Sequence, residues 1–257
     1  MDMNRILTTT PPQGFTPYVF TLEDTLAATT LGQAQRVFVG GEDFLAYEIC
    51  FRSTQQFKFS WRDVAQSEQF TPISINTRSL VGSGVWSFKL PVPWLFGAGT
   101  QIEMIAENLG GSGDTLRMTI KGVVVPQNMR GLLPQEILDR KFSPLFVMLY
   151  DVSIGNGVIA STTPNVSIGS RDFTWTGLGL FAVTEPFKFR VRDVNQLSLF
   201  EERTDYEALL GADGVPWIFT QELTLSRNSA IFAELENIGV GADIPFLTAI
   251  GYSLRNS

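Results

Sequence analysis

A ten-residue segment of the chain occurs twice. Residues 57–66 read FKFSWRDVAQ and residues 187–196 read FKFRVRDVNQ, so seven of the ten positions are identical. Two unrelated segments would share about one position in ten by chance. Because an internal repeat fixes the number of folding units, this match constrains the fold more than any other feature of the sequence.

The match continues on both sides of this segment at a spacing of 129 to 131 residues. The matching pairs are Asp43-Phe44 with Asp172-Phe173, Trp86-Ser87-Phe88 with Trp217-Ile218-Phe219, Glu107-Asn108 with Glu236-Asn237, and Thr119 and Gly122 with Thr248 and Gly251. Each copy spans about 110 residues, which is enough to bury a core of its own. We expect an arm at residues 1–14, a first domain at 15–125, a linker at 126–143 and a second domain at 144–257.

Apolar and polar residues alternate inside each copy with a period of two. The alternation runs through residues 57–62, 116–121 and 187–192, and through residues 231–236 apart from Phe232. This pattern is typical of β-strands that have one buried and one solvated face, and clusters of glycine separate the strands. The sequence therefore predicts an all-β chain of two tandem antiparallel β-sandwiches, most simply with jelly-roll topology.

Helices are expected at only two places. In the linker, residues 134–140 read PQEILDR, and a proline at the first helical position sacrifices no hydrogen bond. The second candidate covers residues 201–210 and would be stopped by Gly211. We therefore expect few helices, all of them short.

The composition excludes most catalytic machinery. The chain contains no histidine, so it has no Ser-His-Asp or Cys-His relay and no histidine-ligated zinc. Its one cysteine, Cys50, allows neither an intrachain disulfide nor a Cys-x-x-Cys motif, and we expect it to be a buried inert thiol. We predict that the protein is not an enzyme and carries no cofactor.

The charge balance argues against two classes of partner. The chain has 26 acidic and 19 basic residues, a net charge of −7, and its basic residues are scattered. A duplex-binding domain needs a basic patch, so we expect no specific nucleic-acid partner. No apolar run reaches the roughly 18 residues of a membrane span, and residues 1–20 do not resemble an export signal. We expect neither a membrane partner nor export.

Two carboxylate positions recur in both copies and give four candidates for a glycosidase site, which needs only a pair of Asp or Glu side chains. They are Asp63, Glu107, Asp193 and Glu236. We interpret them as structural residues, with the Arg62-Asp63 and Arg192-Asp193 pairs forming strand-end ion pairs or turn hydrogen bonds. Glu107-Asn108 and its counterpart are interpreted as turn residues, with Asn tolerating positive φ.

Two other features of the sequence are candidate binding sites. Asp114 and Asp243 lie in matching loops where calcium could bind, but one carboxylate per loop falls short of the oxygen ligands that calcium needs. Residues 155–160 read GNGVIA, yet no helix follows to hold a dinucleotide phosphate, so we interpret these glycines as turn residues. No catalytic, cofactor-binding or metal residue is predicted.

Tryptophans are the remaining candidates for ligand contact, because an exposed indole can stack on a sugar. Trp86 and Trp217 are equivalent across the repeats and lie in apolar strands, which favours the core. Trp94 has no partner in the second copy and is the better candidate for an exposed contact, and Trp175 is a further candidate. These residues keep open a carbohydrate-binding function.

Three segments of the first copy carry a resemblance to a known class of proteins. They read PWLFGAGTQI at residues 93–102, ENLG at 107–110 and RMTIKG at 117–122. The pattern resembles virion structural proteins of tailed bacteriophages, which have a strand after P-x-x-F-x-x-G-T-x-I, an x-N-L turn and a closing strand that ends in glycine. The second copy keeps Asn237, Thr248 and Gly251 but departs from the pattern at residues 226–229.

The resemblance implies a non-enzymatic virion protein located in the virion and assembled in the host cytoplasm. Its expected role is a capsid decoration (cement) or collar component that acts through protein interfaces. Its partners would be other virion proteins, such as a major capsid protein or neck proteins, and copies of itself in a trimer or larger homo-oligomer. Two alternatives stay open: a double jelly-roll major capsid protein, and a carbohydrate-binding or receptor-binding β-sandwich.

Overall fold

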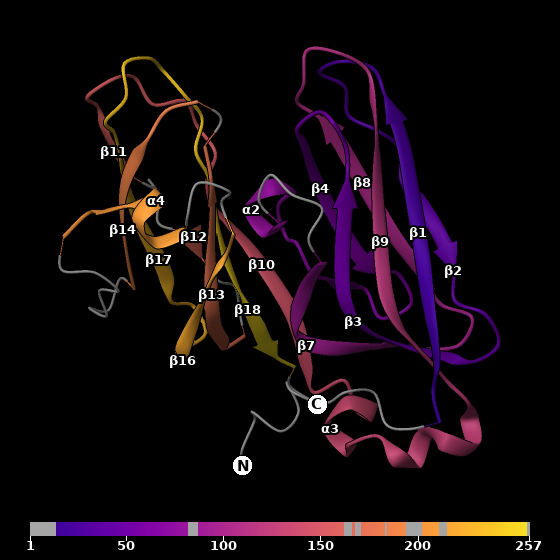
Figure 1. The fold of residues 1–257 in the computed structure, drawn as a ribbon. Coiled ribbons are helices and arrows are strands. Elements are labelled where there is room, and N and C mark those ends of the chain that lie inside the picture. Colours follow the sequence, from indigo (N-terminus) through magenta and orange to yellow (C-terminus); the bar gives the residue numbers. More distant parts are fainter. Residues whose placement is uncertain are drawn as a thin grey trace. The chain divides into compact units, whose positions relative to one another are not determined.

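The structure is a computed structural model that describes residues 14–81, 87–161, 166–167, 171–182, 184–193, 202–210 and 215–255. Most of these residues lie in antiparallel β-strands, as the two-residue period predicts (Figure 1). Among the described residues, no helix is long and apolar enough to cross a membrane.

The first repeat forms two antiparallel sheets. One has the order β1-β9-β3-β7 and the other the order β2-β8-β4-β5. The strands of the first sheet are β1 (Thr16–Leu26), β9 (Asp114–Val125), β3 (Asp43–Arg52) and β7 (Ser87–Phe96). The strands of the second are β2 (Gln35–Phe38), β8 (Gln101–Asn108), β4 (Phe57–Asp63) and β5 (Glu68–Gln69), and the short β6 (Ile75–Asn76) follows in the chain.

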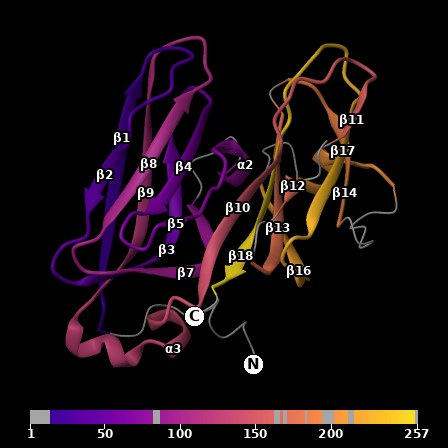
Figure 2. The same ribbon diagram turned by 180° about the vertical axis from the view of Figure 1, so that it is seen from behind.

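The second repeat has the same arrangement, with the orders β10-β18-β13-β16 and β11-β17-β14-β15. Its first sheet contains β10 (Phe142–Tyr150), β18 (Phe246–Leu254), β13 (Phe173–Phe181) and β16 (Trp217–Leu225). Its second sheet contains β11 (Ile159–Ser161), β17 (Ala230–Asn237), β14 (Phe187–Asp193) and β15 (Thr204–Asp205), with β12 (Val166–Ser167) also paired to β17. Figure 2 shows β14 beside β17.

The strand order identifies the topology of both repeats. If the eight principal strands of each repeat are counted along the chain, one sheet reads 1-8-3-6 and the other 2-7-4-5. Eight strands split in this way between two sheets form a jelly roll. The predicted fold of two tandem antiparallel β-sandwiches is therefore confirmed.

The apolar residues of the alternating segments face the interior, as predicted. Phe57 and Phe59 of β4 are fully buried, and so are their counterparts Phe187 and Phe189 in β14. Phe232, which interrupts the alternation of β17, lies half-buried. It packs under the guanidinium of Arg192, whose carbon Cζ lies 4.7 Å from the ring centroid.

A glycine in the last strand of each repeat permits close contact with the neighbouring strand. A Cβ atom added to Gly122 would lie 2.2 Å from the carbonyl oxygen of Leu45 and 2.5 Å from the ring of Phe44. A Cβ added to Gly251 would lie 2.1 Å from the carbonyl oxygen of Thr174 and 2.6 Å from the ring of Phe173. The same steric constraint therefore explains why both copies have glycine here.

The helices match the predictions in part. The linker contains the 3₁₀ helix η1 (Gln127–Leu132) and the helix α3 (Gln135–Leu138), the latter within the predicted segment. The predicted helix at residues 201–210 is shortened to α4 (Tyr206–Leu210), and Gly211 lies outside the described residues. The helix α2 (Arg78–Val81) was not expected, because four residues are too few to show a helical period.

The linker covers part of the first jelly roll. Leu133 and Ile137 of the linker join a buried cluster with Leu45, Leu95 and Val123 of the sheet β1-β9-β3-β7. Burial of these side chains stabilises the linker by the hydrophobic effect, at about 1.5–3 kcal/mol for each large side chain. The linker is thus an integral part of the fold.

The chain divides into two compact units, and each unit includes a short segment of the other repeat. Unit 1 comprises residues 1–72, 85–145 and 252–257, and unit 2 comprises residues 73–84 and 146–251. In unit 1 the backbone N–H of Arg255 donates to the carbonyl of Lys141 at 2.8 Å. Its Nε lies 3.2 Å from Glu68 Oε2, and its guanidinium carbon lies 5.4 Å from the ring centroid of Trp94. The domain boundaries expected from the sequence stay a prediction.

We predict that Gly122→Ala and Gly251→Ala each lower the free energy of unfolding by about 1–3 kcal/mol, because the added methyl overlaps a carbonyl oxygen and an aromatic ring. Chemical denaturation measures the effect. Gly111→Ala is the control, because a Cβ at Gly111 meets no atom within 4 Å. Equal stability of Gly122→Ala and Gly111→Ala would contradict the steric argument.

Candidate functional site

Asp114, the candidate calcium ligand of the first copy, holds a loop of the first jelly roll. Its Oδ2 accepts hydrogen bonds from the backbone N–H of Thr54 at 2.6 Å and of Gln55 at 2.7 Å, and from the Thr54 hydroxyl at 3.0 Å. Burial by itself would raise the pKa of Asp114, but these bonds and one from the backbone of Thr115 hold it below its ordinary value. The carboxylate therefore serves as an acceptor for loop N–H groups.

Asp243 does the same in the second jelly roll. Its Oδ2 accepts hydrogen bonds from the backbone N–H of Thr184 at 2.7 Å and of Glu185 at 2.9 Å. These two donors stand 130 residues after those of Asp114. Among the residues that the structure describes, no group of three or more Cys, Asp or Glu side chains could hold a metal ion.

A buried asparagine closes another loop in both copies. The Nδ2 of Asn108 donates to the carbonyls of Ala27 at 3.1 Å and Ser112 at 2.9 Å, and its Oδ1 accepts from the N–H of Gly110 at 2.8 Å. Asn237 makes the equivalent bonds in the second jelly roll. Both residues end strands, β8 and β17, and neither has positive φ, so the predicted conformation was wrong.

Asp63 is completely buried and accepts hydrogen bonds from side chains of the core. Its Oδ2 accepts from Trp94 Nε1 at 3.0 Å, and its Oδ1 accepts from the Thr100 hydroxyl at 2.9 Å and from the N–H of Gln66 at 3.2 Å. Trp94 has no exposed surface, so the expectation that it is the exposed tryptophan was wrong. The counterpart of Asp63, Asp193, is 9% exposed. Both positions belong to the core.

The other candidates for ligand contact are distributed differently. Trp175 is buried, and its indole Nε1 donates to the carbonyl of Gly177 at 2.7 Å. Trp217 is half-buried and is therefore more exposed than the core location predicted for it. Trp86 lies outside the described residues. Cys50 is half-buried, against the prediction of a buried thiol.

The repeated glutamates do not lie in turns. Glu107 belongs to β8 and Glu236 to β17, each one residue before the strand ends, so the interpretation as turn residues was wrong. Glu107 stands opposite Lys58 in the strand register. Glu236 Oε2 lies 3.0 Å from the Nε of Arg203. The glutamates therefore face cations on the outward sides of their sheets.

One turn glycine of the first copy is replaced in the second copy without loss of the turn. Gly99 has a φ of +73°, and Asn228, 129 residues later, has a φ of +63°. Asp43 Oδ1 accepts the backbone N–H of Ala98, and Asp172 Oδ1 accepts that of Arg227, each at 2.8 Å. Asparagine can adopt this left-handed conformation at low cost, so the departure at residues 226–229 preserves the turn. Gly157 has a φ of +67° in a turn, which supports the interpretation of residues 155–160 as a turn.

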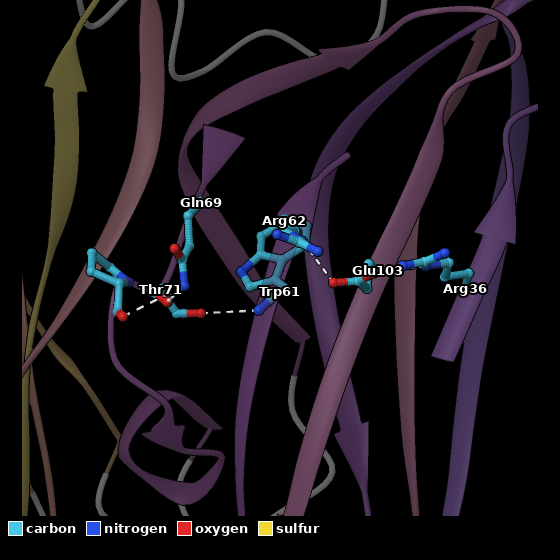
Figure 3. Close-up of polar contacts among 7 residues, drawn as sticks. Arg36, Trp61, Arg62, Gln69, Thr71 and Glu103 are labelled. Atoms are coloured by element: carbon cyan, nitrogen blue, oxygen red, sulfur yellow. Dashed lines mark hydrogen bonds and ion pairs between the residues drawn. The ribbon is translucent and has the colours of Figure 1, made fainter. Parts of the chain in front are cut away.

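An ion-pair cluster lies on the outward face of the sheet β2-β8-β4-β5 in the first jelly roll. Glu103 lies between two arginines, with Oε2 at 2.6 Å from Arg36 Nε and Oε1 at 2.6 Å from Arg62 Nε (Figure 3). The glutamate side chain is 2% exposed, whereas both arginines are about half exposed. Arg62 therefore pairs with Glu103, so the ion-pair alternative for Arg62 and Asp63 was wrong. The turn hydrogen bond is present, because Asp63 Oδ1 accepts the N–H of Gln66, three residues later.

A small pocket of about 110 Å³ adjoins this cluster. It is lined by Ser60, Trp61, Arg62, Gln69, Glu103 and Ile105. Burial alone would raise the pKa of Glu103, but hydrogen bonds and attraction from Arg62 and Arg36 hold it below its ordinary value. Glu103 is therefore ionised at neutral pH and has both oxygens occupied, so it is poorly suited to act as a general acid or base.

Sequence reasoning missed the cluster because its members are far apart in the chain. Arg36, Arg62 and Glu103 are brought together by the register, in which Glu103 stands opposite Arg36 on one side and Arg62 on the other. No motif marks this arrangement, and only the strand pairing could have revealed it.

No protein-family model and no curated protein matches the sequence. Among solved structures, the major capsid protein P2 of bacteriophage PM2 has a TM-score of 0.43 and 10% identity, over 93% of this chain and 98% of that chain. N-glycanase F has a TM-score of 0.42 and 9% identity, over 93% and 96%. The turret protein A223 of Sulfolobus turreted icosahedral virus has a TM-score of 0.23 and 9% identity, over 92% and 99%. At these values the likeness establishes neither a shared family nor a shared activity.

We predict that Asp114→Asn lowers the free energy of unfolding at pH 7 by about 1–3 kcal/mol. The substitution replaces a charged carboxylate that accepts several N–H bonds with a neutral amide, which is a weaker acceptor. The difference from the parent should shrink as the pH falls below the ordinary value of 3.8. The folded state holds the pKa low, so it binds fewer protons than the unfolded chain, and the stability contributed by Asp114 is lost on acidification.

Denaturant unfolding between pH 7 and pH 2.5 measures this difference. Glu42→Gln, at an exposed position, is the control and should match the parent throughout. A constant gap between Asp114→Asn and the parent over this range would contradict the role given to the charged carboxylate.

Proposed function

We propose that the protein is a structural component of a virion and that it builds a shell as a double jelly-roll subunit. The observation that carries the proposal is the strand order, which is 1-8-3-6 and 2-7-4-5 in both repeats. Jelly rolls of this kind form viral shells, although the same architecture also occurs in lectins and cupins. The fold by itself therefore leaves several functions open. The roles of the polar residues favour a structural protein over an enzyme.

Several of the polar residues that both repeats share hold loops and strand ends through hydrogen bonds. Asp114, Asp243, Asn108 and Asn237 accept or donate hydrogen bonds to loop backbone, and Asp63 accepts from core side chains. A duplicated catalytic site would instead leave such groups facing a cavity. This pattern supports a non-enzymatic protein whose function lies in its surfaces.

Several large apolar side chains lie on the surface of the first jelly roll. Tyr18 and Val19 of β1 are 48% and 53% exposed, and Phe38 of β2 is 64% exposed. β1 stands at the end of the strand order of its sheet. Exposed apolar residues on an edge strand are typical of surfaces that pair with other chains. They support partners among virion proteins and a homo-oligomer of three or more copies. Such partners would place the protein in the virion, after assembly in the host cytoplasm.

A second candidate is a decoration (cement) or collar component that attaches to a shell made by another protein. It is favoured by the resemblance of residues 93–102, 107–110 and 117–122 to virion proteins of tailed bacteriophages. In this role, two unequal jelly rolls in one chain would bind two related sites, and their combined attachment would exceed either one alone.

Copy number separates the two roles. We predict that particles purified from cells that produce this chain contain hundreds of copies of it and no more abundant shell protein, as measured by quantitative mass spectrometry and electron cryomicroscopy. A shell that persists after the chain is stripped away would instead support the decoration role. Particles that lack the chain altogether would overturn both.

A further inference from the structure

The helix α2 shows how a short helix can be seated on a jelly-roll sheet. Within unit 2, the Ser79 hydroxyl lies 2.8 Å from the hydroxyl of Thr248 in β18. A Cβ on Gly179 of β13 would lie 1.7 Å from the carbonyl oxygen of Ser79, so backbone meets backbone there. The guanidinium carbon of Arg78 lies 5.2 Å from the ring centroid of Phe181. These contacts leave Ser79 fully buried.

The helix α4 is the counterpart of α2 in the second repeat. The N–H of Arg78 donates to Asn76 Oδ1 at 2.9 Å, and the N–H of Glu207 donates to Asp205 Oδ1 at the same distance. This shared turn fixes a spacing of 129 residues, which aligns Arg78 with Glu207 and Ser79 with Ala208. Unlike Ser79, Ala208 is exposed, and so is Glu207. The α4 residues that correspond to the sheet-contacting residues of α2 are therefore exposed to solvent.

α2 contacts Gly179, Phe181 and Thr248 of the second jelly roll, and the corresponding surface of the first jelly roll is also defined by the repeat. The same spacing aligns Gly179 with Cys50, Phe181 with Arg52 and Thr248 with Thr119. Cys50 stands opposite Thr119 in the pairing of β3 with β9, and Arg52 lies two residues further along β3. Arg52 is exposed, and Cys50 and Thr119 are half-buried. Both halves of the contact therefore have counterparts at the surface of the chain.

We propose that α4 of one copy docks on the outward face of the sheet β1-β9-β3-β7 of a second copy, over Cys50 and Thr119. In this contact Glu207 would meet Arg52, where Arg78 meets Phe181 in the observed one. The cation–aromatic contact would thus be replaced by an ion pair between two exposed side chains. Cys50 has a side chain where Gly179 has none, so α4 would lie farther from the sheet than α2 does.

The charges of the two surfaces favour this occupant. Four basic and two acidic side chains project from the outward face of the sheet: Arg52, Lys89, Arg117, Lys121, Glu23 and Glu48. Residues 202–209 of the α4 segment read ERTDYEAL, with three acidic and one basic residue. Opposite net charges on two surfaces raise the association rate and disfavour wrong partners.

The contact joins two different surfaces, and each copy has one of each. Such a heterologous contact builds a closed ring if the rotation closes and a filament if it does not. The inference follows from the repeat and the seated α2, and it would hold whether or not the chain belongs to a virion.

A charge exchange tests the contact. Sedimentation velocity of the full chain from about 1 to 100 µM should show association, weakened tenfold or more by Glu207→Arg or by Arg52→Glu. The double variant should recover to within a few-fold of the parent, because it restores opposite charges. Glu42→Arg, at an exposed position elsewhere, is the control and should associate normally. A parent that stays monomeric, or singles that have no effect, would overturn the proposal, as would a double variant as weak as its singles.

A disulfide trap locates the contact independently of charge. In Ala208→Cys the new thiol should pair with the native Cys50 of another copy under mild oxidation, since both would lie within disulfide distance. Covalent dimers and larger species should appear on a non-reducing gel and should be absent in the double variant Ala208→Cys with Cys50→Ser. The control Ser153→Cys, at an exposed loop position, should not give the Cys50 cross-link. A disulfide within one chain, or none at all, would overturn the proposal.

These outcomes are separable from those of the proposed function. A chain that passes both tests but is missing from particles would refute the virion role and leave the contact intact. A chain found in the shell whose variants assemble normally would refute the contact alone.

Discussion

Backbone groups in the loops of a jelly roll need hydrogen-bond partners, and side chains supply them at fixed positions in this protein. A loop that leaves one sheet and enters the other has no neighbouring strand for its N–H groups, and a buried N–H without an acceptor is costly. Asp114 and Asp243 accept the N–H groups of loop residues that approach from about sixty positions earlier in the chain. Asn108 and Asn237 do the same for the turns that follow them. The crossing of the chain between its sheets depends on these four side chains.

The two copies diverged on their outward faces while these internal bonds were kept. In the first repeat Arg62 pairs with Glu103 across β4 and β8. The equivalent arginine of the second repeat, Arg192, lies over Phe232, and an ion pair between Arg190 and Glu234 stands two residues away along the same two strands. Outward residues tolerate such exchanges because they are partly solvated, whereas an interior residue must fit the core.

The sequence predicted the strands, the repeat and the jelly roll well, because these depend on a period of two and on identity between distant segments. The exposure of Trp94 was predicted wrongly, because a polar partner for its indole N–H lies on another strand, at Asp63. The cluster of Arg36, Arg62 and Glu103 was not predicted, since it follows from strand register. The helix α2 was missed because its burial depends on β13 and β18 of the other repeat, and no local pattern records that contact.

The position of Arg255 bears on the order in which the chain acquires its structure during synthesis. This residue lies in unit 1, where it contacts Lys141, Glu68 and Trp94, yet it is translated more than a hundred residues after all three. In a nascent chain, these contacts of the first jelly roll can form only after Arg255 has been synthesised. A protein cut short before this residue would keep both repeats and still leave the first one unfinished.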